Sequence, residues 1–275
     1  MNKGVRKFLR HRGAVIGSLL VLAFLGVALF APALAPHDPL AQDLAVRLQA
    51  PSSNYVFGTD DFGRDVFSRV IWGSRVSLRL GLVAVAIALL FGGTIGLLAG
   101  YYGGWFDMLG MRLMDLMLAF PSILLAIVVV AILGPSLTNA MIAVGVMAVP
   151  QYARIVRGSV LTVRDLEYVQ AARALGAGDR RILARAILPN ISGPIIVTAS
   201  LGLATAVLEA AGLSFLGLGA QPPTPEWGSM LSQGRELVLI APWVLTAPGV
   251  AVFLSVLGFN LVGDALSDLL DPRRT

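Results

Sequence analysis

The sequence contains no cysteine and only two histidines among its 275 residues, and just 13% of its residues are charged. The absence of cysteine excludes disulfide bonds and thiolate metal sites, although it does not identify a cellular compartment. A soluble globular protein carries charge on about a quarter of its residues. This chain therefore lacks the polar groups that would cover a water-exposed surface, and we expect most of its surface to face lipid.

Motifs that bind nucleotides or carry out hydrolysis are also missing. There is no GxxxxGK[ST] stretch to hold a nucleotide phosphate. There is no GxSxG, no HExxH and no plausible Ser–His–Asp set. His11 and His37 are isolated in the sequence, which argues against a metal site. We therefore expect no enzyme activity in this chain, and no catalytic, metal-binding or cofactor-binding residues.

Long apolar runs dominate what is present, since 56% of the residues are hydrophobic and the mean hydropathy is +0.79. A helix that spans a membrane needs roughly 20 mostly apolar residues. Six segments meet this requirement, at residues 14–35, 80–101, 111–133, 137–153, 191–208 and 241–263. The sequence predicts an all-α integral membrane fold with six transmembrane helices. Pro121, Pro194 and Pro248 fall inside these segments, where neighbouring helices can satisfy the freed carbonyls.

The first apolar segment also has features of a secretory signal. It follows a basic stretch and ends in the Ala33, Leu34, Ala35 triplet, which resembles a cleavage site. The apolar run is longer than a usual signal core, and Pro36 would follow the cut and block it. We therefore expect this segment to be a retained membrane anchor.

The distribution of Lys and Arg predicts the orientation, because cytoplasmic loops carry an excess of basic residues. With the N-terminus inside, fifteen of the 21 basic residues fall in inner segments and six in outer segments. This bias also explains the net charge of +5 without a nucleic-acid partner. The predicted organisation is a cytoplasmic segment 1–13, a first helix 14–35, an extracytoplasmic loop 36–77 and a five-helix core 78–275. Within that core, residues 154–190 form a cytoplasmic loop, and both termini are cytoplasmic.

The most informative part of that loop, residues 165–189, reads DLEYVQAARALGAGDRRILARAILP. Residues 165–175 predict an Ala-rich helix, and the glycines after it predict a break. Asp179 is a candidate cap for a second helix, 180–188, which Pro189 would end.

Two interpretations of this loop follow from its composition. One face of the first helix is small and apolar, and it could dock into a groove of a partner protein. Its residues are Tyr168, Ala171, Ala172 and Leu175. Alternatively, the segment could lie on anionic lipid with its basic side. That side comprises Arg173, Arg180, Arg181 and Arg185. Composition alone does not decide between the two.

The same segment resembles the EAA loop of permease subunits of ATP-binding-cassette importers, whose pattern is EAA, three residues, Gly, nine residues and I-x-L-P. Gln170 replaces the usual Glu and Ala186 stands at the Ile position, which puts any salt bridge expected of that Glu in doubt. The resemblance implies a coupling helix that docks onto a cytoplasmic ATPase. The residues expected to form it are Tyr168, Gln170, Ala171, Ala172, Leu175, Gly176, Leu188 and Pro189.

Several other segments resemble one subgroup of these permeases, the "C" subunit of dipeptide, oligopeptide and nickel importers. They are GTDDFGRDVFSR at 58–69, WGSRVSLRLG at 72–81, DMLGMRLMDLMLAFPSILLAI at 107–127 and EAAGLSFLGLGAQPPTPEWGSM at 209–230. The first 50 residues match only in their pattern of a basic start, one span and an outer loop.

The resemblance implies a type I ABC-importer permease fold, multi-pass in the bacterial inner membrane. It implies a second homologous permease subunit, two ABC ATPase subunits that hold ATP and Mg, an extracytoplasmic substrate-binding protein and surrounding membrane lipid. No cofactor is expected in this chain itself. Peptides are the favoured substrate, and glutathione or a nickel chelate stays open.

Two other functional classes remain as competitors. A self-powered secondary transporter or channel usually shows intramembrane charges or paired broken helices, and this sequence offers only Glu209 and no repeat. A membrane scaffold without transport is the other. Glu209 is a candidate for the translocation pathway, where it could meet a peptide amino group or a cation. Alternatively, it is an interfacial residue bonded to nearby backbone.

Two further charged clusters are expected to be structural. Arg112 and Asp115 lie one helical turn apart and are predicted to pair. The carboxylates of residues 60–65 could suggest a metal site. Arg64 and Arg69 lie among them, however, so we expect a folded outer loop with ion pairs that contacts a binding protein.

Overall fold

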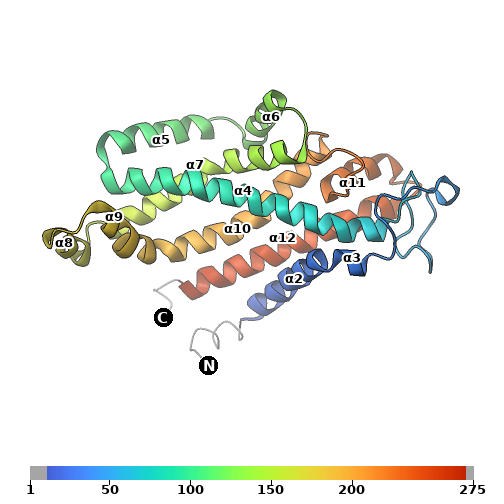
Figure 1. The fold of residues 1–275 in the computed structure, drawn as a ribbon, viewed down its shortest axis with the longest axis horizontal. Helices are drawn as coiled ribbons and strands as arrows, with labels where there is room; N and C mark the ends of the chain where they lie inside the picture. Colours follow the sequence, from blue (N-terminus) through green and yellow to red (C-terminus); the bar gives the residue numbers. More distant parts are fainter. Residues whose placement is uncertain (1–10, 271–275) are drawn as a thin grey trace.

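The computed structural model describes residues 11–270 and shows an elongated bundle of helices (Figure 1). The helices are α2 (Arg12–Leu29), α3 (Ala31–Leu34), η1 (Leu44–Val46), α4 (Val66–Tyr102), α5 (Gly104–Leu118), α6 (Ser122–Leu133), α7 (Leu137–Val163), α8 (Glu167–Ala174), α9 (Asp179–Ile182), the π-helical turn η2 (Leu183–Ile187), α10 (Leu188–Phe215), α11 (Trp227–Gly234), η3 (Arg235–Leu237) and α12 (Pro242–Leu270). No strand occurs within residues 11–270, and the predicted all-α membrane fold is confirmed. The basic residues Lys3, Arg6, Lys7, Arg10, Arg273 and Arg274, used above for the orientation, lie outside the described residues.

Five stretches within these residues are long and apolar enough to cross a membrane: α2, α4, α7, the continuous stretch Asp179–Phe215, and α12. A sixth span results if α5 and α6, which are bent by 93°, are counted together. The predicted span over 111–133 is therefore divided between two helices and is not one continuous helix. The chain breaks at residues 119–121 because Pro121 cannot donate a backbone hydrogen bond and disfavours helical geometry at Phe120.

The start of α4 is another difference from prediction, since the helix begins at Val66 and not near residue 80. The carboxylate of Asp65 caps it by accepting a hydrogen bond of 2.9 Å from the Ser68 N–H. The extension carries Arg69, Arg75 and Arg79, which an apolar-run criterion excludes although they continue the same helix. The irregular part of the predicted loop 36–77 therefore ends at Asp65, and residues 66–77 are helical.

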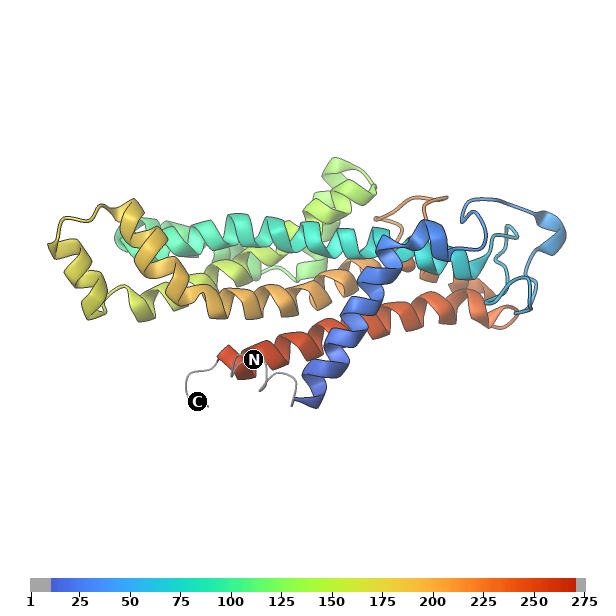
Figure 2. The same cartoon turned by 60° about the horizontal axis from the view of Figure 1, so that its bottom comes forward.

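Small residues hold the centre of the bundle together. A Cβ at Gly92 of α4 would lie 2.4 Å from the carbonyl oxygen of Val149 in α7, and one at Gly96 would lie 2.3 Å from that of Ala153. Such close approach of two backbones is how helices associate in lipid. The first span, α2, packs on the outside of this centre and crosses α12, as Figure 2 shows.

The two ends of the bundle differ (Figures 1 and 2). Residues 36–65 and α11 gather at one end, the loop end, whereas α8 and α9 project from the opposite end, the α8 end. The loop end contains the predicted ion pairs. Arg64 Nε lies 2.6 Å from Asp60 Oδ2. The buried Arg69 donates to the carbonyl of Pro39 at 3.0 Å. These bonds tie the loop to the start of α4.

Candidate functional site

The α8 end is built around a glycine turn. Gly176 has a φ of 78°, a left-handed conformation that residues with a side chain rarely adopt. Its N–H bonds to the carbonyl of Arg173 at 3.0 Å, and the Ala177 N–H bonds to the carbonyl of Ala172 at 3.0 Å. This pair of bonds is the Schellman arrangement that terminates a helix and satisfies its last carbonyls. It explains why the motif requires glycine at position 176.

The α8 helix buries one face and exposes the other. Val169 is fully buried against Ile182 and Ile187, and Ala172, one turn further on, packs on the same cluster. Ala172 is therefore partly buried on the inner side of α8. Tyr168, Ala171 and Leu175 are exposed. Leu175 is the most prominent of them, because it is 88% exposed although it is apolar.

Gln170, which replaces the usual Glu, has a specific contact. Its Nε2 donates a hydrogen bond of 2.9 Å to the carbonyl oxygen of Asp165. A glutamate carboxylate has no hydrogen to donate and could not make this bond. Gln170 therefore fastens the start of α8 to the preceding turn while the residue itself stays exposed.

The second half of the loop is more continuous than predicted. Asp179 does not cap α9 with its side chain, and instead its Oδ1 accepts a hydrogen bond of 2.7 Å from the Tyr101 hydroxyl. Pro189 does not end a helix either. It stands in the first turn of α10, where its missing N–H is tolerated. The turn η2 joins α9 to α10, so Asp179–Phe215 runs as one helical stretch, with Leu188 exposed at its bend.

Two ion pairs connect α5 to α7 near the same end. Asp107 accepts from Arg157 Nη2 at 2.6 Å, and Asp115 accepts from Arg154 Nη2 at 2.5 Å. The predicted Arg112–Asp115 pair was wrong. The partner comes from another helix because α7 extends to Val163, beyond the predicted end of its span.

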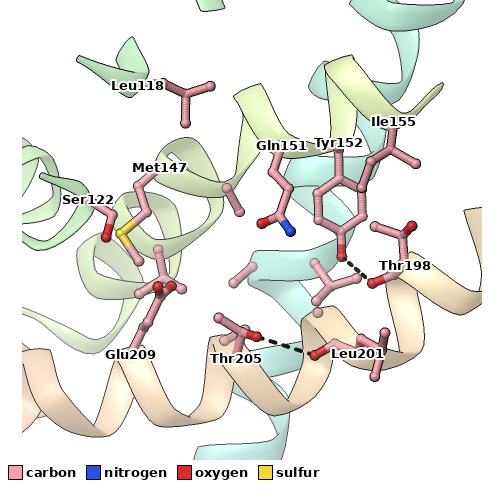
Figure 3. Close-up of a pocket in the computed structure, with 16 residues that line it drawn as sticks. Leu118, Ser122, Met147, Gln151, Tyr152, Ile155, Thr198, Leu201, Thr205 and Glu209 are labelled. Carbon is pink, nitrogen blue, oxygen red and sulfur yellow. Dashed lines mark hydrogen bonds between the residues drawn. The ribbon is translucent and has the colours of Figure 1, made fainter. Parts of the chain in front are cut away.

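The other candidate site is a cavity of about 260 Å³ between α4, α5, α6, α7 and α10. Figure 3 shows Glu209 pointing into it from α10 towards Met147 and Ser122, with Gln151 and Tyr152 of α7 further along the cavity. Leu118 and Ser122, on the two sides of the break between α5 and α6, also line it. Within the described residues, no group donates a hydrogen bond to the Glu209 carboxylate, which contradicts the interpretation that it is bonded to nearby backbone.

Sequence reasoning identified Glu209 but not the other polar residues of this cavity. They are Ser122, Gln151, Tyr152, Thr198 and Thr205. Each is an uncharged residue in an apolar helix, and in sequence they resemble ordinary interhelical polar residues. Only the fact that they line the same cavity from several helices identifies them as candidate site residues.

Comparison with known proteins gives consistent matches. Residues 92–275 match the family "binding-protein-dependent transport system inner membrane component", and residues 3–51 match "N-terminal TM domain of oligopeptide transport permease C". The chain is 52% identical to the dipeptide transport system permease protein DppC of Alkalihalophilus pseudofirmus, covering 96% of this chain and 87% of that protein. It is 47% identical to the di/tripeptide transport system permease protein DppC of Pseudomonas aeruginosa, covering 98% and 90%.

Two further matches extend this picture. The glutathione transport system permease protein GsiD of Pectobacterium atrosepticum is 47% identical, over 98% of this chain and 89% of its own length. A solved inward-facing structure of the MetNI methionine ABC transporter shares the fold with a TM-score of 0.61 at 20% identity. That match covers 74% of this chain and 96% of the other.

Proposed function

The chain belongs to the family of binding-protein-dependent transport system inner membrane components, as its loop motifs predicted, and we propose that it forms half of the passage of an ATP-driven peptide importer. In this proposal a second, homologous permease forms the other half. Two ATPase subunits supply the energy, with ATP and Mg bound to them and not to this chain. An extracytoplasmic binding protein delivers the cargo.

The observation that carries the proposal is the exposed apolar face of α8. Leu175, at 88% exposure, and Tyr168 project from a helix held in place by the buried Val169. An apolar side chain on a rigid, projecting helix suits a groove on a partner protein. The ATPase-coupling residues are then Tyr168, Gln170, Ala171, Leu175, Gly176, Leu188 and Pro189, with Ala172 supporting them from the inner face.

The continuous stretch Asp179–Phe215 supports a mechanism for coupling. This stretch connects α9, which follows the docking helix α8, to Glu209 in α10. The turn η2 lies between α9 and α10. Rotation of α8 and α9 as the ATPases close would move α10 with them as a rigid body. This movement would change the shape of the cavity that Glu209 lines. Packed helices transmit such rigid shifts because they switch between discrete arrangements.

The membrane orientation is part of the proposal. The α8 end faces the cytoplasm together with both termini, and the loop end faces the binding protein. The positions of Arg173, Arg180, Arg181 and Arg185, at the α8 end, support it, because cytoplasmic segments carry the basic residues. The membrane is the bacterial inner membrane.

Di- and tripeptides are the proposed substrate class, supported by the names of the relatives at 52% and 47% identity. Glutathione is the second candidate, favoured by the likeness to GsiD. Glutathione is itself a tripeptide with a free amino group, so both candidates share much of their chemistry.

A reconstitution experiment tests the proposal. The chain is expressed with the neighbouring genes for a second permease, ATPases and a binding protein, and purified through a tag on this chain. We expect the ATPases to co-purify, and proteoliposomes to accumulate a labelled dipeptide when ATP is present. A complex without an ATPase would overturn the importer role, and uptake of glutathione but no dipeptide would favour the second candidate.

A further inference from the structure

The cavity around Glu209 contains one carboxylate and no cation. No Lys or Arg is among the described residues that line it. A carboxylate at membrane depth is costly unless it is paired, and charges in such positions commonly mark a substrate or ion pathway. In its ionised form, the Glu209 carboxylate therefore has no positively charged partner among residues 11–270.

Three hydroxyl groups of the cavity, those of Tyr152, Thr198 and Thr205, donate their hydrogens to backbone carbonyls. Thr198 donates to the carbonyl of Pro194 at 2.8 Å, and Thr205 donates to that of Leu201 at 3.4 Å (Figure 3 shows the second bond). The Tyr152 hydroxyl donates to the carbonyl of Thr198 at 3.3 Å. A hydroxyl that has donated its hydrogen offers only lone pairs to a ligand. The Tyr152, Thr198 and Thr205 hydroxyls therefore present acceptors to a ligand in the cavity.

The position of Tyr152 depends on a glycine in the facing helix. A Cβ at Gly202 of α10 would lie 2.0 Å from the Tyr152 hydroxyl oxygen. The absence of a side chain at Gly202 lets the tyrosine reach across to α10 and place its oxygen at the cavity wall. Gln151, the adjacent residue in α7, points into the cavity from the same side (Figure 3).

The broken span lies at the same place. Leu118 ends α5 and Ser122 begins α6, and both line the cavity. Transporters bind substrate groups where a membrane helix is interrupted beside a cavity, because irregular backbone is tolerated there. The break, the lone carboxylate and the acceptor groups are three independent features that converge on one cavity.

We propose that this cavity is a transient binding site for the protonated amino group of the cargo as it crosses the membrane. Glu209 pairs with the ammonium group, and two of the side-chain oxygens of Gln151, Tyr152 and Thr205 accept its two remaining hydrogens. An ammonium group has three hydrogens to donate and accepts none, so it matches this set of acceptors. The inference rests on the proposed peptide import.

The size of the cavity is consistent with a partial ligand. Its volume of about 260 Å³ lies below the roughly 300–1,000 Å³ of pockets that enclose a whole small-molecule ligand. It accommodates the amino end of a peptide, and the remainder of the cargo extends into the passage. Peptides of different sequence share this end, so the site would act on all of them alike.

The chain contains no cysteine, which permits a direct test. In the complete importer, Ser122→Cys places one thiol of this chain on the cavity wall without touching the proposed amino-group ligands. The thiol is labelled with cationic and anionic methanethiosulfonate reagents during ATP hydrolysis, and modification of this chain is followed by mass spectrometry. We expect the cationic reagent to react at least about tenfold faster, because a cleft of one charge concentrates the opposite ion.

Two comparisons then identify the carboxylate and the ligand group. Adding Glu209→Gln should abolish the preference for the cationic reagent. The matched change Glu236→Gln should leave it intact, because the Glu236 side chain is 78% exposed at the loop end. A dipeptide with a free amino group should slow labelling, whereas its N-acetylated analogue should not.

Several outcomes would overturn the inference. These are equal protection by both peptides, an unchanged reagent preference in Glu209→Gln, or a thiol that stays unlabelled throughout turnover. Failure of Glu209→Gln to assemble with the second permease would also do so, because the carboxylate would then pair with that subunit. In each case wild-type uptake of a dipeptide is measured in parallel. If that uptake persists, only the inference fails, and if it is absent, the proposed function fails.

Discussion

The hydroxyl of Tyr101, at the end of α4, donates a 2.7 Å hydrogen bond to the carboxylate of Asp179, the first residue of α9. Tyr101 is buried and packs in the same cluster as Val169 and Ile187. The guanidinium of Arg173 in α8 lies 5.8 Å from the centre of the tyrosine ring. One side chain of the central helix α4 thus contacts both α8 and α9.

Tyr101→Phe should loosen this attachment without unfolding the chain. It removes a hydrogen bond to a charged group, which contributes roughly 1.5–3 kcal/mol. We expect faster hydrogen–deuterium exchange in α8 and α9 and fewer peptides imported per ATP hydrolysed. Tyr102→Phe is the matched control, since Tyr102 is half exposed and no hydrogen bond to its hydroxyl is found within the described residues. Equal exchange in both variants would contradict the role given to Tyr101.

Gly176→Ala and Gly178→Ala separate backbone conformation from steric fit. An added Cβ meets nothing within 4 Å at either position. Gly176 has a φ of 78°, however, whereas Gly178 has a φ of −69°. The left-handed conformation costs a residue with a side chain about 1–2 kcal/mol. Gly176→Ala should therefore lower coupled uptake severalfold and Gly178→Ala should not, as measured in proteoliposomes. Similar losses in the two variants would show that the Schellman turn is not the cause.

Leu175→Asp tests the docking face. Leu175 is 88% exposed at the α8 end, and Leu239 is 95% exposed at the loop end. A charge introduced into an apolar contact would be desolvated on docking, so Leu175→Asp should reduce the ATPase that co-purifies by at least about tenfold. Leu239→Asp makes the same chemical change on the opposite side and should retain the ATPase. Full ATPase recovery with Leu175→Asp would exclude this face from the contact.

Glu226 at the loop end should make stability depend on pH. Burial raises the pKa of its carboxyl group above the usual value, against the opposing effect of hydrogen bonds from the Gly228 and Ser229 N–H groups. A raised pKa in the folded state means that the folded protein binds the proton more tightly than the unfolded one does. The stabilisation is therefore complete below the unfolded pKa, near 4.5, and is lost as the pH rises through the folded pKa.

Glu226→Gln removes this titration. The melting temperature of the wild type relative to the variant should be highest below a pH of about 4.5 and should fall as the pH rises. Thermal unfolding of the purified complex in detergent measures it. Asp38→Asn is the control, because Asp38 is exposed and its change should leave the pH dependence as it is. A wild-type advantage that grows with pH would contradict the assigned direction.

The structure of residues 165–189 was largely predictable from sequence, because its signals are local. Gly176 breaks a helix through its own φ, and Ala-rich residues around 170 form a helix through their own propensity. The inward side of Ala172 and the contact of Asp179 with Tyr101 were not predictable. They depend on where α4 lies relative to the loop. Tyr101 and Asp179 are 78 positions apart, and nothing in the local sequence around either residue indicates the contact.

The charged pairs show the same limit. A pattern one helical turn apart favoured Arg112 as the partner of Asp115, but Arg154 of α7 is the partner in the structure. Local spacing identifies which residues can meet within one helix. Local spacing does not indicate which residues of a neighbouring helix pack against that helix.

The sequence by itself determined that this chain spans a membrane and that a basic loop with a glycine break interrupts its helices. These properties follow from composition and short motifs, since lipid requires apolar runs and turns require particular residues. Tertiary structure alone decided that Glu209, Gln151, Tyr152 and Thr205 share one cavity beside the break at Pro121. Such a site is made by the packing of separate helices, and packing depends on side-chain shapes that no single segment contains.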